Sequence, residues 1–212
     1  MNGNFMCERT VKSVRATHGG LEYAISLDCG DKFTITASDF RRIGEAVLSV
    51  GASVGDELLE ELEFSSAKLS CIRKSLKHLE YGAMTERKLK MKLQGKFPKE
   101  VIESALDILK ENGYINDMQL AFDLCEEYFV NCRMSPLKVK SKLFQKGFPR
   151  EVTSVVFEEY EFSEEIINEN MDFAVRRKFG DELSTDVKRK ALEYLIRLGY
   201  SYEASKYFLE IF

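Results

Sequence analysis

The sequence predicts a mainly α-helical protein in which three tandem three-helix repeats form an elongated stack, preceded by a small N-terminal β-meander with one or two helices. Apolar and polar residues alternate only in the N-terminal part, whereas apolar residues recur with helical spacing from about residue 65 onward. A helix end, an aromatic residue and a new helix start recur together at Phe97, Phe148 and Tyr200, about 50 positions apart. Self-similarity at such a period is typical of stacked helical units. One irregular helical domain without repeats is the alternative.

Three short strands are expected first, over Thr10–Thr17, Glu22–Leu27 and Lys32–Thr36. Turn sequences at His18–Gly20 and Cys29–Asp31 separate them, so the strands form a meander.

A helix follows the meander, with Ser38 or Asp39 as its N-cap and its end near Gly51. A short acidic helix over Asp56–Glu63 comes next. Together with the strands these helices form the expected N-terminal domain, residues 1–64.

The repeats are expected over residues 65–114, 115–160 and 161–212. In each, the middle helix carries apolar residues four apart and ends near a glycine, after which an aromatic residue fills the corner. These apolar pairs are Leu89 and Leu93, Val139 and Leu143, and Ala191 and Leu195. The first helix of the third repeat is expected to bury Ile166, Ile167, Phe173 and Val175.

The net charge of -4 over 212 residues hides an alternation of basic and acidic blocks. Residues 66–99 and 133–150 are strongly basic, whereas residues 100–132 and 151–175 are strongly acidic. Lysines recur at matching repeat positions: Lys88, Lys138 and Lys190 at one, Lys90 and Lys140 at a second, and Lys92 and Lys142 at a third.

Two interpretations of the basic middle helices stay open. Helices of opposite sign can pair within each bundle, which stabilises the protein little per ion pair. Alternatively, the middle helices form one stripe that attracts phosphates or an acidic protein surface.

Motifs for catalysis and cofactor binding are missing from the sequence. Neither common glycine-rich nucleotide-binding motif is present, and the five cysteines include no C-x-x-C pair. The two histidines, His18 and His78, are far apart, which argues against a metal site. Cys125 and Cys132 lie seven apart on one expected helix and are expected to pack in the core. We therefore expect a non-enzymatic protein without metal or cofactor.

The N-terminus lacks the apolar run of a secretory signal, and no stretch is long and apolar enough for a membrane span. A reduced cytoplasmic protein with no membrane partner is the expectation.

The helical part resembles the RecX family, the regulators of the RecA recombinase. The resemblance rests on Tyr81–Leu93, on Asn112–Asp117 followed by Ala121-Phe122, on Ser135–Leu143 with Lys146–Phe148, and on Leu198–Ser201. The strand-rich leader also resembles the N-terminal extension of some family members. The sequence departs from the family at Gly82 and Met84, where arginine is frequent, and at Ser135, which replaces a glycine.

The resemblance implies a modulator that binds the helical RecA–DNA filament as a monomer lying along its groove, and restrains ATP hydrolysis and strand exchange. It implies a role in DNA recombination, DNA repair and the SOS response, contact with single- or double-stranded DNA within the filament, and no cofactor. The alternatives are a direct nucleic-acid-binding helical repeat protein and a protein-interaction scaffold. The candidate partner-contacting residues are Arg87, Lys88, Lys90, Lys92, Lys138, Lys140, Lys142 and Lys190.

Overall fold

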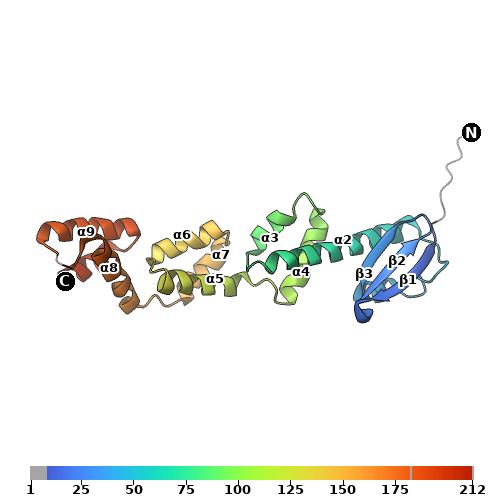
Figure 1. Cartoon of the computed structure of the whole chain (residues 1–212), viewed down its shortest axis with the longest axis horizontal. Helices are drawn as coiled ribbons and strands as arrows, with labels where there is room; N and C mark the ends of the chain where they lie inside the picture. The colour runs from blue at the N-terminus through green and yellow to red at the C-terminus, as the bar shows by residue number, and fades with distance from the viewer. Residues whose placement is uncertain (1–8, 182, 212) are drawn as a thin grey trace, which may run out of the picture. The chain divides into compact units, whose positions relative to one another are not determined.

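The structure is a computed structural model that describes residues 9–181 and 183–211 (Figure 1). It is mainly helical with a small N-terminal sheet, which confirms the predicted fold class. The chain divides into two compact units, residues 1–82 with 89–115, and residues 83–88 with 116–212. Within the described ranges, none of the helices has the length and apolarity needed to cross a membrane.

The N-terminal sheet contains β1 (Val11–Thr17), β2 (Glu22–Leu27) and β3 (Lys32–Thr36) in the order β1-β2-β3. Both pairs are antiparallel, and Ile25 of β2 lies opposite Phe33 of β3. The three predicted strands and their meander order are therefore confirmed.

One face of this sheet is covered by helices, and the residues between them form a common core. The helix α1 (Ala37–Ile43) follows β3, and its Phe40 ring stacks on Tyr23 with the ring centroids 3.9 Å apart. The buried residues of this core are Val11, Ile25, Leu27, Phe33, Ile35, Phe40, Leu48, Val54 and Leu62.

Three predictions for this region are wrong. The N-cap of α1 is Thr36, whose hydroxyl accepts a hydrogen bond from the N–H of Asp39, and not Ser38 or Asp39, which lie inside the helix. The helix α1 ends at Ile43 and not near Gly51, because Gly44 adopts φ +105° and its N–H caps the carbonyl of Phe40. The predicted acidic helix at Asp56–Glu63 does not stop there but continues as α2 (Asp56–Leu79), in which no glycine or proline interrupts the backbone hydrogen bonds. The expected domain boundary after residue 64 thus lies inside α2.

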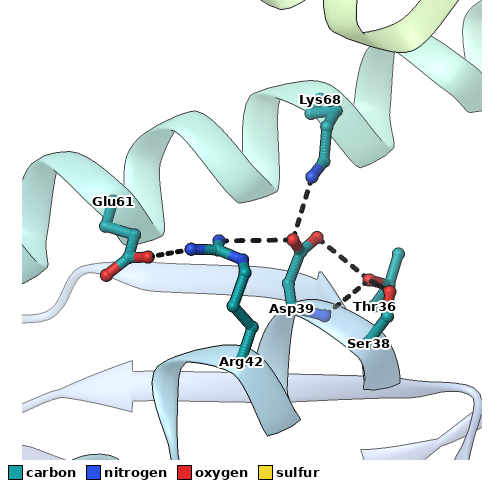
Figure 2. A network of polar contacts seen from close by, with 6 residues as sticks. All are labelled: Thr36, Ser38, Asp39, Arg42, Glu61 and Lys68. Carbon is teal, nitrogen blue, oxygen red and sulfur yellow. Dashed lines mark hydrogen bonds and ion pairs between the residues drawn. The ribbon is translucent and has the colours of Figure 1, made fainter. Parts of the chain in front are cut away.

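A buried carboxylate, Asp39 on α1, joins the sheet region to α2 (Figure 2). Lys68 Nζ donates a hydrogen bond to Asp39 Oδ1 and Thr36 Oγ1 donates one to Asp39 Oδ2, both at 2.9 Å. Arg42 contacts both Asp39 and Glu61, which adds a second carboxylate, from α2, to the network. Burial alone would raise the pKa of Asp39, but the hydrogen bonds from Lys68 and Thr36 outweigh it and hold this pKa below its ordinary value.

Replacing Asp39 with asparagine leaves Lys68, whose side chain is 11% exposed, without its counter-ion. We expect the free energy of unfolding to fall by about 3 kcal/mol at neutral pH. Because folding lowers the pKa of Asp39, this stabilisation is complete above the ordinary value of 3.8 and is lost as the pH falls through the folded-state pKa. Urea unfolding at a series of pH values should show the difference between the two proteins shrinking on the acid side. Exposed Glu45→Gln is the control, and a difference that does not change with pH would contradict the assignment.

The first unit also contains α4 (Lys99–Glu111) and part of α3 (Glu86–Leu93). The residues of α3 from Leu89 onward belong to this unit. The helix α4 packs against α2 and buries Val101, Ala105 and Leu109.

The second unit begins with residues 83–88 and continues through α5 (Asp117–Glu126), a π-helical turn η2 (Glu127–Asn131), α6 (Pro136–Lys146) and α7 (Arg150–Glu159). The core shared by these helices contains Ala121, Cys125, Phe129, Val139, Leu143, Phe148 and Val156.

The π-helical turn changes which residues α5 and its continuation bury. The N–H of Cys132 donates to the carbonyl of Glu127, five residues earlier, at 2.9 Å, so the face presented to the core rotates along the turn. Cys125 is fully buried, which raises the pKa of its thiol to about 12, whereas Cys132 is exposed. The prediction that both cysteines pack in the core is therefore right for Cys125 and wrong for Cys132.

The remaining helices are α8 (Glu164–Phe179), α9 (Thr185–Leu198) and α10 (Tyr202–Ile211). Their core contains Met171, Val175, Ala191, Leu195, Tyr200, Phe208 and Leu209. Phe173 was expected in this core but is 41% exposed, because Met171 and Val175 face the core and Phe173 lies between them on the helix. The helices thus follow one another in groups α2–α4, α5–α7 and α8–α10, while the division into domains at residues 64, 114 and 160 stays a prediction.

The aromatic residues at the corners differ in burial. Phe148 and Tyr200 are buried as predicted, whereas Phe97 is only half-buried. The segment between Leu93 and Phe97 is one residue shorter than the matching segment before Phe148, and α3 ends at Leu93. Phe97 therefore follows a different turn.

We expect Phe148→Ala to lower the free energy of unfolding by about 3–5 kcal/mol, because the side chain is 3% exposed and its removal leaves a cavity. Phe97→Ala should lower it by only about 1–2 kcal/mol. Urea unfolding of the two variants measures the difference, and equal losses would show that the two corners are packed alike.

Candidate partner-binding surface

The middle helices α3, α6 and α9 have the same burial pattern. Both apolar residues of each pair are fully buried: Leu89 and Leu93, Val139 and Leu143, and Ala191 and Leu195. Residues four apart share one face of a helix, so the residue immediately before each pair lies outside that face. Lys88, Lys138 and Lys190 occupy this position, and all three are exposed.

The eight predicted contact residues fall into two groups. Exposed are Arg87, Lys88, Lys92, Lys138 and Lys190, and half-buried are Lys90, Lys140 and Lys142.

Lys90 and Lys140 interact within their own helix groups. Lys90 Nζ lies 3.0 Å from Glu103 Oε1 on α4, and this hydrogen bond lowers the pKa of Glu103. Lys140 Nζ lies 5.3 Å from the centroid of the Phe157 ring on α7. For these two lysines the interpretation of pairing within the bundle is therefore the better one.

The side chains of the exposed group have no ion pair with any residue that the structure describes. Lys88, Lys138 and Lys190 belong to the second compact unit, and Lys92 belongs to the first. That these residues form one continuous stripe stays a prediction.

A further basic cluster in the first unit was missed by the sequence analysis. Burial lowers the pKa of His78, and the positive charges of Lys92, Lys74 and Lys96 add to this effect. Lys74 lies on α2 and Lys96 follows α3, so the helices bring the three lysines around one imidazole. The only signal in the sequence was the basic block at residues 66–99.

Contacts between a hydroxyl and a glycine connect successive middle helices in the second unit. Ser135, the N-cap of α6, is buried and its hydroxyl donates a hydrogen bond to the carbonyl of Leu198 at the end of α9, at 2.5 Å. A Cβ on the next residue, Gly199, would lie 2.8 Å from Ser135 Oγ, and Gly199 also has φ +95°. Both the close approach and the left-handed backbone require glycine here.

A looser approach of the same two kinds of group occurs between Thr85 and Gly147. Thr85 lies directly before α3 and is buried, and a Cβ on Gly147, the C-cap of α6, would lie 3.5 Å from its hydroxyl oxygen. The start of one middle helix thus contacts the end of the next one. These contacts position Lys88 and Lys138, each three residues after the hydroxyl.

Among the described residues, no group of three or more His, Cys, Asp or Glu side chains could hold a metal ion.

Comparisons of the sequence with known proteins found several related regulators. No family model matches the chain. The regulatory protein RecX of Streptococcus sanguinis is 27% identical over 190 residues, which cover 87% of this chain and 70% of the relative. The regulatory protein RecX of Streptococcus pneumoniae serotype 19F is 26% identical with the same coverage.

Two crystal structures have the same fold. A structure of regulatory protein RecX matches with a TM-score of 0.75 and 18% identity, covering 95% of this chain and 99% of that protein. A structure of RecX from Lactobacillus salivarius matches with a TM-score of 0.60 and 16% identity, covering 68% of this chain and 95% of that one.

The contact between Ser135 and Gly199 can be tested by substitution. Gly199→Ala should lower the free energy of unfolding by about 2–3 kcal/mol, because it combines backbone strain with a clash against the Ser135 hydroxyl. Gly95→Ala is the matched control, since Gly95 has φ +77° and no atom within 4 Å of a Cβ. Its cost should be backbone strain alone, about 1 kcal/mol.

Combining Gly199→Ala with Ser135→Ala should give a loss smaller than the sum of the two single losses, because the clash with the hydroxyl requires both residues. The approach of the new Cβ to Leu137 Cβ, 3.1 Å away, is the same in both backgrounds. Urea unfolding of the unmodified protein, the two single variants and the double variant measures the four free energies of unfolding. Additive losses would show that the hydroxyl and the glycine act independently.

Proposed function

The chain belongs to the family of regulatory protein RecX, and from that premise we propose that it regulates the RecA recombinase without catalysing a reaction itself. In this proposal it binds the RecA–DNA filament and restrains its ATP hydrolysis and strand exchange. The chain would act in the cytoplasm as a monomer, in DNA recombination and repair. It would contact the protein and the DNA of the filament.

The observation that carries the proposal is the recurrence of exposed lysines on successive middle helices. Lys88, Lys138 and Lys190 hold the same place beside a buried apolar pair and have no ion pair within the described residues. A filament repeats the same groups along its length, so a protein with repeated contacts can engage several of them at once. Lysines also speed association with an anionic partner and release its counter-ions when they contact phosphates.

The competing interpretations make different demands on these residues. Lysines that only stabilise the helix bundle need a partner within it, as Lys90 has in Glu103. A scaffold that binds through apolar contacts would associate with little dependence on salt. Salt dependence therefore separates the proposal from a scaffold.

The test is a triple variant, Lys88→Gln, Lys138→Gln and Lys190→Gln, in the full chain. We expect it to stay folded, because exposed lysines contribute little to stability. Its binding to RecA–DNA filaments should weaken, and the slope of log affinity against log salt should fall by about 2–3 units, just under one for each lost phosphate contact. Co-sedimentation with filaments over a range of salt concentrations measures both quantities, and RecA ATP hydrolysis measures the regulatory effect.

The matched control is Lys12→Gln, Lys32→Gln and Lys77→Gln, which removes the same charge from exposed lysines outside the middle helices. It should bind filaments with nearly the original salt slope. If both triple variants bind alike, the lysines of the middle helices do not contact the partner and the proposal fails.

A further inference from the structure

A groove of about 650 Å³ in the second unit combines positive charge with aromatic rings. Its cations are Arg133, Arg177 and Lys178, and its rings are Phe173 and Tyr194. Among the residues that the structure describes, no carboxylate lines it. The guanidinium carbon of Arg133 lies 4.3 Å from the centroid of the Phe173 ring, and Lys178 Nζ lies 5.0 Å from that of Tyr194. Each ring is thus paired with a cation at the surface.

The π-helical turn η2 builds one wall of this groove. It ends at Asn131 with Cys132 as its C-cap, and Arg133 follows with φ +53°, a left-handed conformation that is uncommon for arginine. Asn170 on α8 is buried, and its side-chain amide donates to the carbonyl of Phe129 within the turn at 2.9 Å. This hydrogen bond holds the turn against α8, the helix that carries Phe173. The groove is therefore formed by packed elements.

A second cleft, of about 690 Å³, shares the lining residues Arg133, Phe173 and Arg177 with this groove. It differs in charge, because Glu169 and Asp172 line it. Because two carboxylates offset the arginines of the second cleft, an anionic ligand is favoured more strongly in the first groove.

We propose that the groove binds single-stranded nucleic acid, with a base stacked on the Arg133–Phe173 pair or on Tyr194 and with Arg177 and Lys178 contacting the backbone phosphates. Guanidinium planes and aromatic rings both stack on unpaired bases, and neighbouring cations contact the phosphates. A double helix keeps its base faces covered. An acidic peptide would use the cations and leave the rings without a role. The inference goes beyond the proposed function, because it involves none of the lysines of the middle helices.

The absence of tryptophan from the chain allows a direct test. Phe173→Trp introduces a single fluorophore at the groove, and oligothymidylate added to the full-length protein should quench its emission as a base stacks on the indole. Phe144 on α6 is 42% exposed, compared with 41% for Phe173, so Phe144→Trp is the matched control and should not be quenched. Equal quenching of both variants, or of neither, would overturn the inference.

Affinity gives an independent readout that does not depend on a new fluorophore. Phe173→Leu should weaken binding of a fluorescein-labelled oligothymidylate roughly five- to hundredfold, whereas Phe144→Leu should not. The double variant Arg177→Gln, Lys178→Gln should reduce the salt slope by about 1.4 units, the value for two phosphate contacts on a single strand. Polyglutamate and a duplex should compete poorly with the oligonucleotide.

Two outcomes would overturn the inference: unchanged affinity for oligothymidylate in Phe173→Leu, or competition by polyglutamate or a duplex as strong as that by the unlabelled single strand. The proposed function can be judged separately with the same proteins. Loss of oligonucleotide binding in Phe173→Leu identifies the groove if Phe144→Leu keeps oligonucleotide binding and Phe173→Leu itself keeps filament binding. If filament binding is lost only in the triple variant of Lys88, Lys138 and Lys190, the filament contact lies on the middle helices.

Discussion

Complete burial of two apolar residues, four positions apart on each of α3, α6 and α9, is the constraint on which the surface of the helical part depends. Leu143 cannot leave the core of its helix group without a cost of several kcal/mol, so the rotation of α6 about its axis is set. Once that rotation is set, Lys138 faces solvent and Lys140 lies over the neighbouring helix. The charge pattern of the surface is thus a consequence of core packing, and lysines two positions apart on one helix acquire different roles.

The sequence was sufficient to predict elements whose apolar residues repeat every two positions, as in a strand, or every three to four positions, as in a helix. The alternation in Tyr23, Ile25 and Leu27 predicts a strand, and the four-residue spacing of Val139 and Leu143 predicts a buried helix face; both agree with the structure. Helix ends were harder to predict, because they depend on one residue's backbone conformation. Gly44 ends α1 early, whereas nothing in the sequence ends the helix after Glu63.

The candidate site shows the same division between local and non-local causes. Exposure of Lys88, Lys138 and Lys190 follows from their place beside buried residues, so their sequence context predicts it. The pairing of Lys90 depends on Glu103, which another helix supplies, and a pattern within one segment carries no sign of it. The groove at Phe173 could not be predicted for a similar reason, since its residues come from three segments and a π-helical turn orients Arg133.

The hydroxyl–glycine contact between middle helices has a direction, with the hydroxyl at a helix start and the glycine at the end of the following middle helix. At the matching place in α9 stands Val187, which offers no hydroxyl, and a Cβ on Gly95 after α3 would meet no atom within 4 Å. The contact is therefore made between neighbours and is not continued at either end of the series. In evolution, a three-helix group with its own hydroxyl and glycine could be inserted between two existing groups. Its glycine would contact the hydroxyl of the preceding group, and its hydroxyl would contact the glycine of the following group. A group duplicated after α10 would first need a substitution at Val187, so the array can lengthen more readily from within than from its C-terminal end.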